Sequence, residues 1–306
     1  MTKATLQIKG AGKIYDGHRV LDDVTLDVNE GSIVALVGHN GAGKTTMMKL
    51  LLGLIRPSFG EVRVLGLDPA GPEGAVAKRN LGFLPETVAF QQAMTGLGVL
   101  NFYARLKNAD LTANRGLLER VGLADAAKLR VKTYSKGMRQ RLGLAQALLG
   151  APRVMLLDEP TTGLDPALRR SFYDTLSVLK RDGVTVLLSS HALSELESRI
   201  DKVAIMNSGK LMACGTMSDL RNQAHVPVRI RLHTKDGAAG EIADQLNGAE
   251  ISRVNGRVVE FSCAPEEKMM LVRRVSDLGV AVEDMEIDLP TLDQLYSHYR
   301  NDGGLQ

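Results

Sequence analysis

The sequence predicts an α/β fold in which a largely parallel β-sheet is covered by helices. Residues 33–37 and 154–157 are continuous apolar runs, and residues 184–188 are nearly so. Strands that are apolar on both faces belong in a parallel sheet buried between helical layers. Helical patterns between the runs, at residues 166–180 and 192–199, supply the covering layer of a doubly wound fold.

Before and around this core, the pattern predicts smaller elements. Residues 5–8 and 24–28 alternate apolar and polar side chains, as half-exposed antiparallel strands do. Residues 61–65 and 81–84 are further strand candidates. Between residues 95 and 132 the apolar side chains recur at helical spacing, which indicates a small helical insertion.

The first domain is expected to span residues 1–222, with a second domain at residues 226–306. The second segment has a separate series of predicted elements: strand 228–232, helix 239–246, strands 250–254 and 258–262, helix 266–278, strand 280–287 and a last helix at 291–299. Asn255-Gly256 is a strong hairpin signal between the middle strands. The order β-α-β-β-α-β predicts a ferredoxin-like accessory domain of the α+β class.

Composition restricts the function classes. The 306 residues are 44% hydrophobic and 24% charged, as in a globular protein with a substantial core. A net charge of +3 gives no reason to expect a nucleic-acid partner. The two cysteines, Cys214 and Cys263, have no metal-ligand spacing. No run of about 18 uncharged apolar residues is present, so we expect no membrane span in this chain.

Residues 38–46 follow the first buried strand and precede a helix candidate at 45–54. They are Gly38, His39, Asn40, Gly41, Ala42, Gly43, Lys44, Thr45 and Thr46. Glycines let the backbone turn its N–H groups toward an anion, and the helix N-terminus adds partial positive charge. Lys44 is then placed for the β- and γ-phosphates, and the Thr45 hydroxyl for Mg²⁺. The alternative, an ordinary Gly-rich turn, does not explain the full pattern in this context.

Asp158 and Glu159 directly follow the buried strand at 154–157. Such a strand delivers its last residues to the sheet edge where open α/β folds bind ligands. Asp158 is therefore predicted to hold Mg²⁺ through water, and Glu159 to polarise the water that attacks the γ-phosphate. The alternative is a strand-ending turn with solvated acids.

A second phosphate site is predicted at the start of another helix, in the segment 134–141. Ser135 is a good N-cap, and its hydroxyl, the Gly137 N–H and the helix dipole together favour an anion. Two phosphate sites with one nucleotide cradle suggest that the second serves another subunit. A merely capped helix is the alternative.

With these motifs in this order, residues 4–222 resemble the nucleotide-binding subunits of ATP-binding-cassette (ABC) transporters. The matches are Walker A at 38–45, Walker B at 154–159, the signature at Ser135 and Gly137, the D-loop at 163–165, the switch histidine at His191 and the adenine-stacking aromatic at Tyr15. The resemblance implies a P-loop ABC cassette that binds ATP with Mg²⁺ and hydrolyses it. It also implies that His191 senses the γ-phosphate.

Two motifs, the signature and the Q-loop, depart from the family pattern. The signature usually reads Leu-Ser-Gly-Gly-Gln, but here residues 134–138 read Tyr-Ser-Lys-Gly-Met, so Met138 replaces the glutamine. The Q-loop glutamine falls at Glu86, whose carboxylate is expected to face Mg²⁺ or water. Both departures recur in ABC-2-type cassettes and in drug- and metallo-maturation-type cassettes, and we interpret them as marks of a subfamily.

The resemblance further implies partners: a second copy of the chain, closing head-to-tail around two ATP molecules, and a separate integral membrane permease. The ATPase is then peripheral, on the cytoplasmic face of the inner membrane. More narrowly, residues 85–90 and 100–106, the length and the second domain resemble the ATPase of copper-site maturation for nitrous oxide reductase. That assignment implies a periplasmic accessory protein. The alternatives are an ABC-2-type exporter ATPase for a drug, lipid or polysaccharide, and a soluble ABC module that regulates ribosomes.

Overall fold

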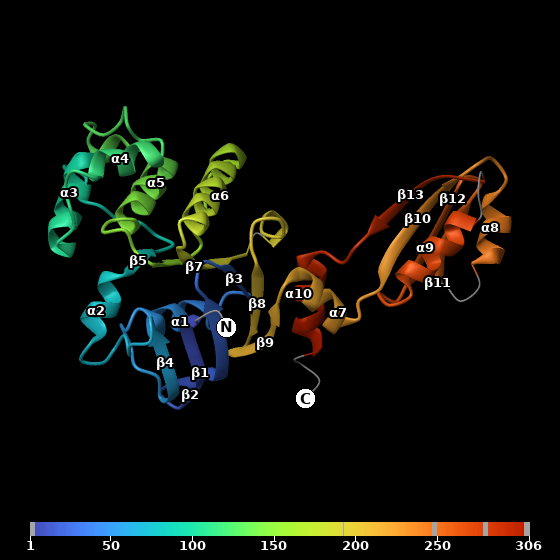
Figure 1. The fold of residues 1–306 in the computed structure, drawn as a ribbon, viewed down its shortest axis with the longest axis horizontal. Helices are drawn as coiled ribbons and strands as arrows, with labels where there is room; N and C mark the ends of the chain where they lie inside the picture. The colour runs from blue at the N-terminus through green and yellow to red at the C-terminus, as the bar shows by residue number, and fades with distance from the viewer. Residues whose placement is uncertain (1–3, 192, 247–249, 278–280, 303–306) are drawn as a thin grey trace. The chain divides into compact units, whose positions relative to one another are not determined.

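The computed structural model describes residues 4–191, 193–246, 250–277 and 281–302 (Figure 1). The chain divides into two compact units, Met1–Cys214 and Gly215–Gln306. This division falls earlier than the boundary at 222–226 expected from the sequence. The reason is that helix α7 (Met217–Ala224) packs on α10 (Leu292–Asp302) of the second unit, where the Tyr299 hydroxyl donates to the Leu220 carbonyl at 3.4 Å.

The first unit is built on a six-stranded sheet with the order β5-β6-β7-β3-β8-β9. Its strands are β3 (Ile33–Val37), β5 (Leu81–Leu84), β6 (Val154–Leu157), β7 (Thr185–Ser190), β8 (Lys202–Asn207) and β9 (Lys210–Gly215). The pairs from β5 to β8 are all parallel. Every residue of β3, β6 and β7 is buried, which explains the apolar runs and confirms the predicted parallel core.

A second, three-stranded sheet has the order β2-β1-β4 and is antiparallel, as the alternating patterns predicted. Its strands are β1 (Ala4–Tyr15), β2 (His18–Asn29) and β4 (Phe59–Val64). One apolar cluster joins this sheet, helix α1 (Lys44–Leu51) and the central sheet through residues such as Ile8, Leu36 and Met47. Helix α1, which begins at the phosphate loop, is therefore anchored on both sheets.

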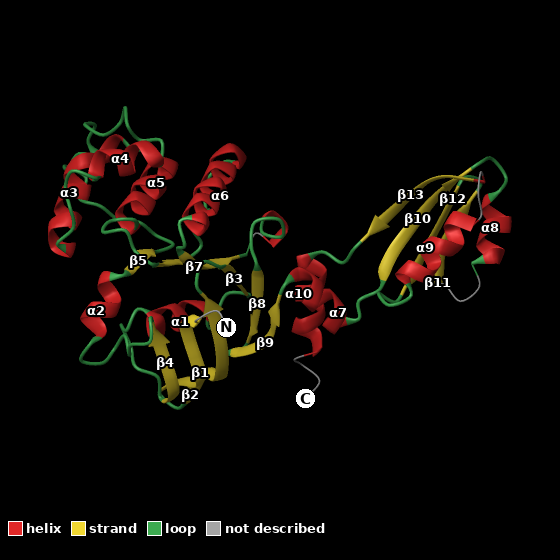
Figure 2. Ribbon diagram, viewed as in Figure 1, coloured by secondary structure: helices red, strands yellow, loops and turns green. Residues whose placement is uncertain are grey.

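Helices form the third part of the first unit (Figure 2). They are α2 (Gly74–Arg79), α3 (Gly96–Lys107), α4 (Asn114–Arg120), the 3₁₀ turn η1 (Val131–Thr133), α5 (Lys136–Ala147) and α6 (Pro166–Arg181). The predicted helical insertion corresponds to α3, α4 and η1, and α3 and α4 both pack on α5. Side chains cap three of these helices: Thr95, Ser135 and Asp165 accept N–H groups of α3, α5 and α6.

The prediction of a helix at residues 192–199 is wrong. The structure has only the short 3₁₀ turn η2 (Leu193–Glu195), and residue 192 lies outside the described residues. The backbone bonds that follow are spaced by three residues, from the Leu196 N–H to the Leu193 carbonyl and from the Arg199 N–H to the Leu196 carbonyl. The apolar spacing that suggested an α-helix serves instead to bury Leu193 and Leu196 in tight turns.

The second unit contains a four-stranded antiparallel sheet with the order β11-β12-β10-β13. Its elements are β10 (Val228–Thr234), α8 (Ala239–Gln245), β11 (Glu250–Asn255), β12 (Val258–Cys263), α9 (Lys268–Asp277) and β13 (Val282–Asp288). Ile242 of α8 and Leu271 of α9 share a core with Phe261 of β12. The chain order and strand order are those of a ferredoxin-like fold, as predicted.

Among the described residues, no helix combines the length and apolar character that crossing a membrane requires.

Candidate functional site

The loop between β3 and α1 depends on its glycines. Gly41 and Gly43 have φ values of 87° and 101°, in the region that favours glycine. A Cβ on Gly43 would also lie 2.6 Å from Leu21 Cδ2, and a Cβ on Gly38 would lie 2.8 Å from the Met206 carbonyl oxygen. Side chains at these positions would force the loop out of its cradle shape, so the structure gives a physical reason for the motif.

Lys44 is 7% exposed, and its ammonium group donates to the carbonyl oxygens of Gly38 and His39 across the loop. Burial lowers the pKa of Lys44, while the nearby carboxylates of Glu159, Asp158 and Glu86 partly oppose that change. A largely desolvated ammonium group on the first residue of α1 fits an anionic phosphate.

The loop lines a cavity of about 280 Å³, together with acidic residues distant in sequence. The lining residues are Val20, His39, Asn40, Gly41, Gly43, Lys44, Thr45, Thr46, Glu86, Asp158 and Glu159. The Thr45 hydroxyl donates to Asp158 Oδ2 at 3.3 Å. Hydroxyl and carboxylate oxygens are the ligands that Mg²⁺ prefers, so the residues present fit a magnesium nucleotide. The sequence patterns did not single out Val20 as a lining residue.

Glu159 and His191 follow β6 and β7, which are neighbours in the sheet. Glu159 Oε2 lies 2.7 Å from His191 Nδ1, and the His191 side chain is 66% exposed. Glu159 has a φ of 47°, which is uncommon for a residue with a side chain. The structure therefore brings both predicted catalytic residues together, with Glu159 held in a strained backbone conformation.

Ser189 is fully buried beside these groups, and the sequence reasoning missed it. Its hydroxyl donates to Asp158 Oδ1 at 2.7 Å and accepts the Glu159 N–H at 2.8 Å. The available signal was a polar side chain at the end of an apolar strand, two residues before His191. In the sequence, such a residue cannot be distinguished from an ordinary strand end until the neighbouring strand is known.

The segment with the signature lies at the start of α5 and does not line the loop cavity. The Ser135 hydroxyl accepts the Met138 N–H at 3.2 Å, as expected of an N-cap. Lys136, one of the departures from the family pattern, lies over the D-loop, since a Cβ on Gly163 would be 2.5 Å from Lys136 Cε. The two segments predicted to bind phosphate thus lie in different parts of the chain, and phosphate binding at Ser135 and Gly137 stays a prediction.

Tyr15 ends β1 and is 41% exposed, with Lys13 Nζ 5.0 Å from its ring centroid. It is not among the residues that line the loop cavity. Its stacking on adenine stays a prediction.

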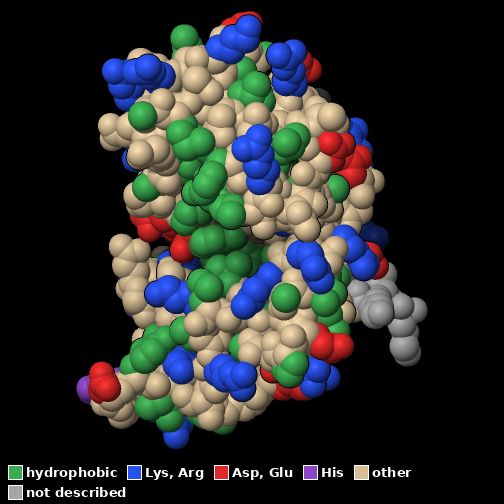
Figure 3. Space-filling view, turned by 90° about the vertical axis from the view of Figure 1, so that its left-hand side faces the viewer, with side chains coloured by type: hydrophobic (Ala, Val, Ile, Leu, Met, Phe, Trp, Pro, Cys, Tyr) green, Lys and Arg blue, Asp and Glu red, His purple; other side chains and the backbone are tan. Residues whose placement is uncertain are grey.

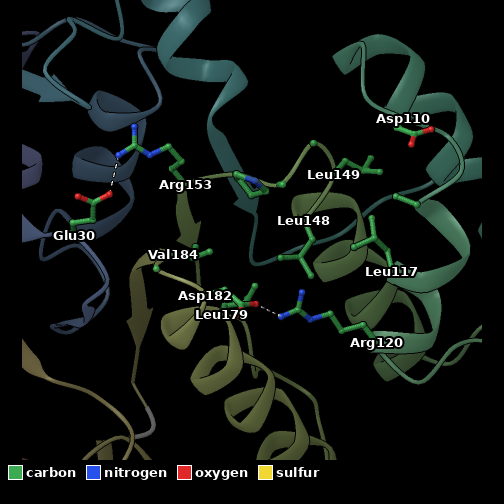
Figure 4. A pocket seen from close by; sticks show the side chains of 15 residues that line it. Glu30, Asp110, Leu117, Arg120, Leu148, Leu149, Arg153, Leu179, Asp182 and Val184 are labelled. Carbon is green, nitrogen blue, oxygen red and sulfur yellow. Dashed lines mark hydrogen bonds and ion pairs between the residues drawn. The ribbon is translucent and has the colours of Figure 1, made fainter.

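A larger cavity, of about 600 Å³, lies at the opposite edge of the central sheet, where β6 and β7 begin (Figure 4). Its walls carry two ion pairs, Arg120–Asp182 at 3.0 Å and Arg153–Glu30 at 2.8 Å, around leucine side chains. It contains none of the predicted site residues. The nucleotide site is therefore identified by the residues that line a cavity and not by the size of the cavity.

Comparison with known proteins agrees with a nucleotide-binding site at the phosphate loop. Residues 21–162 match the family described as ABC transporter. The daunorubicin resistance ATP-binding protein DrrA3 of Streptomyces coeruleorubidus is 33% identical over 99% of this chain and 98% of its own length. The doxorubicin resistance ATP-binding protein DrrA of Mycobacterium tuberculosis is 33% identical over 94% of this chain and 91% of its own.

A solved structure, an ATP-binding subunit of an ABC transporter, aligns with a TM-score of 0.67 and 31% identity over 72% of this chain and 92% of its own. Similarity over the full length of the chain at this level establishes the family. The phosphate loop and the acidic residues expected of that family line the cavity described above. The chain belongs to the family of ABC transporter ATP-binding subunits, and it is an ATPase that uses ATP with Mg²⁺.

Proposed function

We propose that the chain powers an ABC-2-type exporter by hydrolysing ATP for a separate integral membrane subunit. The observation that carries this proposal is the similarity to two drug-resistance ATP-binding proteins, which extends through the second unit as well as the cassette. The exported compound is accordingly a drug-like molecule, with lipids and polysaccharides as the other classes. The ATPase works as a peripheral subunit on the cytoplasmic face of the inner membrane.

In this proposal the loop binds the triphosphate and its metal. The Lys44 ammonium group contacts the β- and γ-phosphates, and the loop N–H groups of residues 38–46 surround them. Thr45 and Asp158 hold Mg²⁺, which neutralises charge on the phosphates. Glu86, which lines the same cavity, faces the metal or its water. Tyr15 stacks on the adenine from the end of β1.

Hydrolysis is assigned to the pair at the ends of β6 and β7. The Glu159 carboxylate orients and polarises the attacking water and takes its proton as the water oxygen bonds to the γ-phosphorus. The bond from the γ-phosphorus to the β,γ-bridging oxygen breaks in the same step, and ADP leaves with that oxygen. His191, 2.7 Å from Glu159, contacts the γ-phosphate and reports its loss. Both residues reach the site from strand ends in a packed sheet, so their separation is well defined.

A second copy of the chain completes each site. Ser135 and Gly137 lie outside the loop cavity of their own chain, at the N-terminus of α5, where backbone N–H groups and the helix dipole favour a phosphate. In a head-to-tail dimer they would face the γ-phosphate bound by the partner. Two ATP molecules then hold the dimer closed until hydrolysis reopens it.

The membrane subunit is proposed to dock in an apolar groove of the first unit. Figure 3 shows hydrophobic side chains gathered in a hollow on this face. The groove has a volume of about 490 Å³ and is lined by parts of α3, β5 and the segment after α1, including Tyr103, Leu106 and Leu54. Leu106 and Leu54 are 70% and 65% exposed, an unusual exposure for two neighbouring leucines. Pro85, beside Glu86 of the ATP cavity, also lines the groove, which connects the two sites.

The double variant Leu54→Glu/Leu106→Glu is expected to lose co-purification with the membrane subunit while keeping the ATPase activity of the isolated chain. The reason is that two charges in the groove oppose burial of an apolar partner segment. Surface substitutions of this kind change stability little. Leu129→Glu, on a leucine that is 52% exposed outside the groove, is the matched control. Undiminished co-purification of the double variant would place the partner elsewhere.

The narrower function, copper- and sulfur-site maturation of nitrous oxide reductase with a periplasmic accessory protein, rests on resemblance along residues 85–106 and on the appended unit. Neither drug-resistance relative described above carries that name, so the assignment stays a prediction. Under it, a strain with Glu159→Gln would make reductase polypeptide that lacks its catalytic copper cluster, as metal analysis of the purified reductase would show. A reductase that matured normally in that strain would exclude this function and leave the exporter.

A further inference from the structure

Ser189 forms hydrogen bonds with both acidic residues of the proposed hydrolytic site. Its side chain is fully buried at the carboxyl end of β7, next to the end of β6. The Glu159 N–H donates to the Ser189 hydroxyl oxygen at 2.8 Å. Asp158 Oδ1 lies 2.7 Å from the same oxygen. Because the backbone N–H has to donate, the Ser189 hydroxyl proton is directed to the Asp158 carboxylate.

The bond to Asp158 occupies one carboxylate oxygen and leaves the other for the metal side of the cavity. Oδ1 accepts from Ser189, while Oδ2 lies 3.3 Å from the Thr45 hydroxyl. Thr45 is the phosphate-loop residue proposed above to bind Mg²⁺. With Oδ1 held, rotation of the carboxylate about its terminal torsion is restricted, and Oδ2 stays directed at the ligand.

The bond from Glu159 acts on the backbone. A φ of 47° is costly for a residue with a Cβ, and such conformations persist only where neighbouring groups hold them. The Ser189 hydroxyl accepts the N–H of this strained residue, and the His191 N–H lies 3.3 Å from Glu159 Oε2. Strand β7 and His191, the residue that follows it, therefore hold Glu159 at both its backbone and its carboxylate.

We propose that Ser189 is a positioning residue for ATP hydrolysis, which orients Asp158 toward Mg²⁺ and holds Glu159 in its left-handed conformation. This inference rests on the proposed roles of Asp158 and Glu159. Ser189 does not touch the nucleotide, and it acts through two hydrogen bonds from one oxygen atom. A hydroxyl allows one oxygen atom both to accept an N–H and to donate strongly to a carboxylate, which a thiol does only weakly and a methyl group not at all.

The test compares Ser189→Ala, Ser189→Cys and Ser189→Thr in the full chain. Cysteine nearly keeps the volume of serine but hydrogen-bonds weakly, whereas threonine keeps the hydroxyl. The alanine and cysteine variants are expected to lose kcat at least ~10-fold, which corresponds to about 1.4 kcal/mol of barrier. The Mg²⁺ concentration for half-maximal activity should rise several-fold, and threonine should be more active than cysteine.

Calorimetry supplies a readout besides activity. Binding of ATP in EDTA should stay close to that of the wild type, because the phosphate loop is untouched, while the gain in affinity on adding Mg²⁺ should shrink. Thr185→Val is the matched control: Thr185 is equally buried on the same strand, and its hydroxyl accepts the Gly31 N–H at 3.1 Å, away from the site. This control should keep the wild-type Mg²⁺ dependence.

Wild-type kcat and Mg²⁺ dependence in Ser189→Ala would overturn the inference. So would a loss shared equally by Thr185→Val or tracking only a lower Tm, since either would show a merely structural role. The proposed function is judged separately: if Glu159→Gln hydrolysed ATP normally, the hydrolytic assignment itself would fail, whatever Ser189 does.

Discussion

Glu159→Gln is expected to bind ATP and to hydrolyse it at least ~10²-fold more slowly than the wild type, the usual scale for losing a general base. Glutamine has almost the same shape but cannot take a proton from water. The site is otherwise retained, because Lys44, Thr45 and Asp158 are unchanged. Phosphate release under saturating ATP measures the rate, and equilibrium binding of labelled ATP measures retention of the nucleotide.

The same variant should accumulate as an ATP-bound dimer, since hydrolysis is what reopens the pair, and size-exclusion chromatography with ATP would detect it. Glu61→Gln is a suitable control: Glu61 lies on β4, pairs with Arg63, and is 45% exposed away from the loop cavity. Its activity should stay at the wild-type level. Near-normal turnover of Glu159→Gln would remove Glu159 from the mechanism.

Lys44→Ala and Ser135→Arg are each expected to abolish most ATPase activity, and mixing the two proteins is expected to restore part of it. Each homodimer carries two defective sites. A mixed dimer carries one site with both defects and one intact site, because the loop of one chain meets the signature of the other. Random mixing at equal amounts would return about a quarter of wild-type activity if one intact site suffices in a two-fold dimer.

Steady-state ATPase assays before and after mixing measure this recovery. Mixing Lys44→Ala protein with itself is the control, and it should return nothing. Because Ser135 caps α5, Ser135→Arg also loses about 1 kcal/mol of helix stability, so its folding is checked by circular dichroism. If mixed dimers formed without any recovery, a site shared between two chains would be ruled out.

The sequence alone determined the features that arise from consecutive residues. The phosphate loop was predictable because Gly41 and Gly43 need positive φ and because Lys44 and Thr45 follow them directly on a helix. The fully buried strands and the alternating strands were predictable because side-chain period reports burial over a few residues. The ferredoxin-like order of the second unit followed in the same way, with Asn255-Gly256 marking its hairpin.

The tertiary structure alone decided what meets across the sheet. The order β5-β6-β7-β3 places Glu86, Asp158 and the phosphate loop around one cavity, although Thr45 of the loop and Asp158 are 113 residues apart in the chain. Ser189 became visible only when β7 was placed beside β6, and the left-handed backbone of Glu159 only when its neighbours were known. The prediction of a helix at 192–199 was wrong because buried turns and helices can share the same apolar spacing, and only the packed structure distinguishes them. Local periodicity records which side of an element is buried, whereas long-range packing selects the partner that buries it.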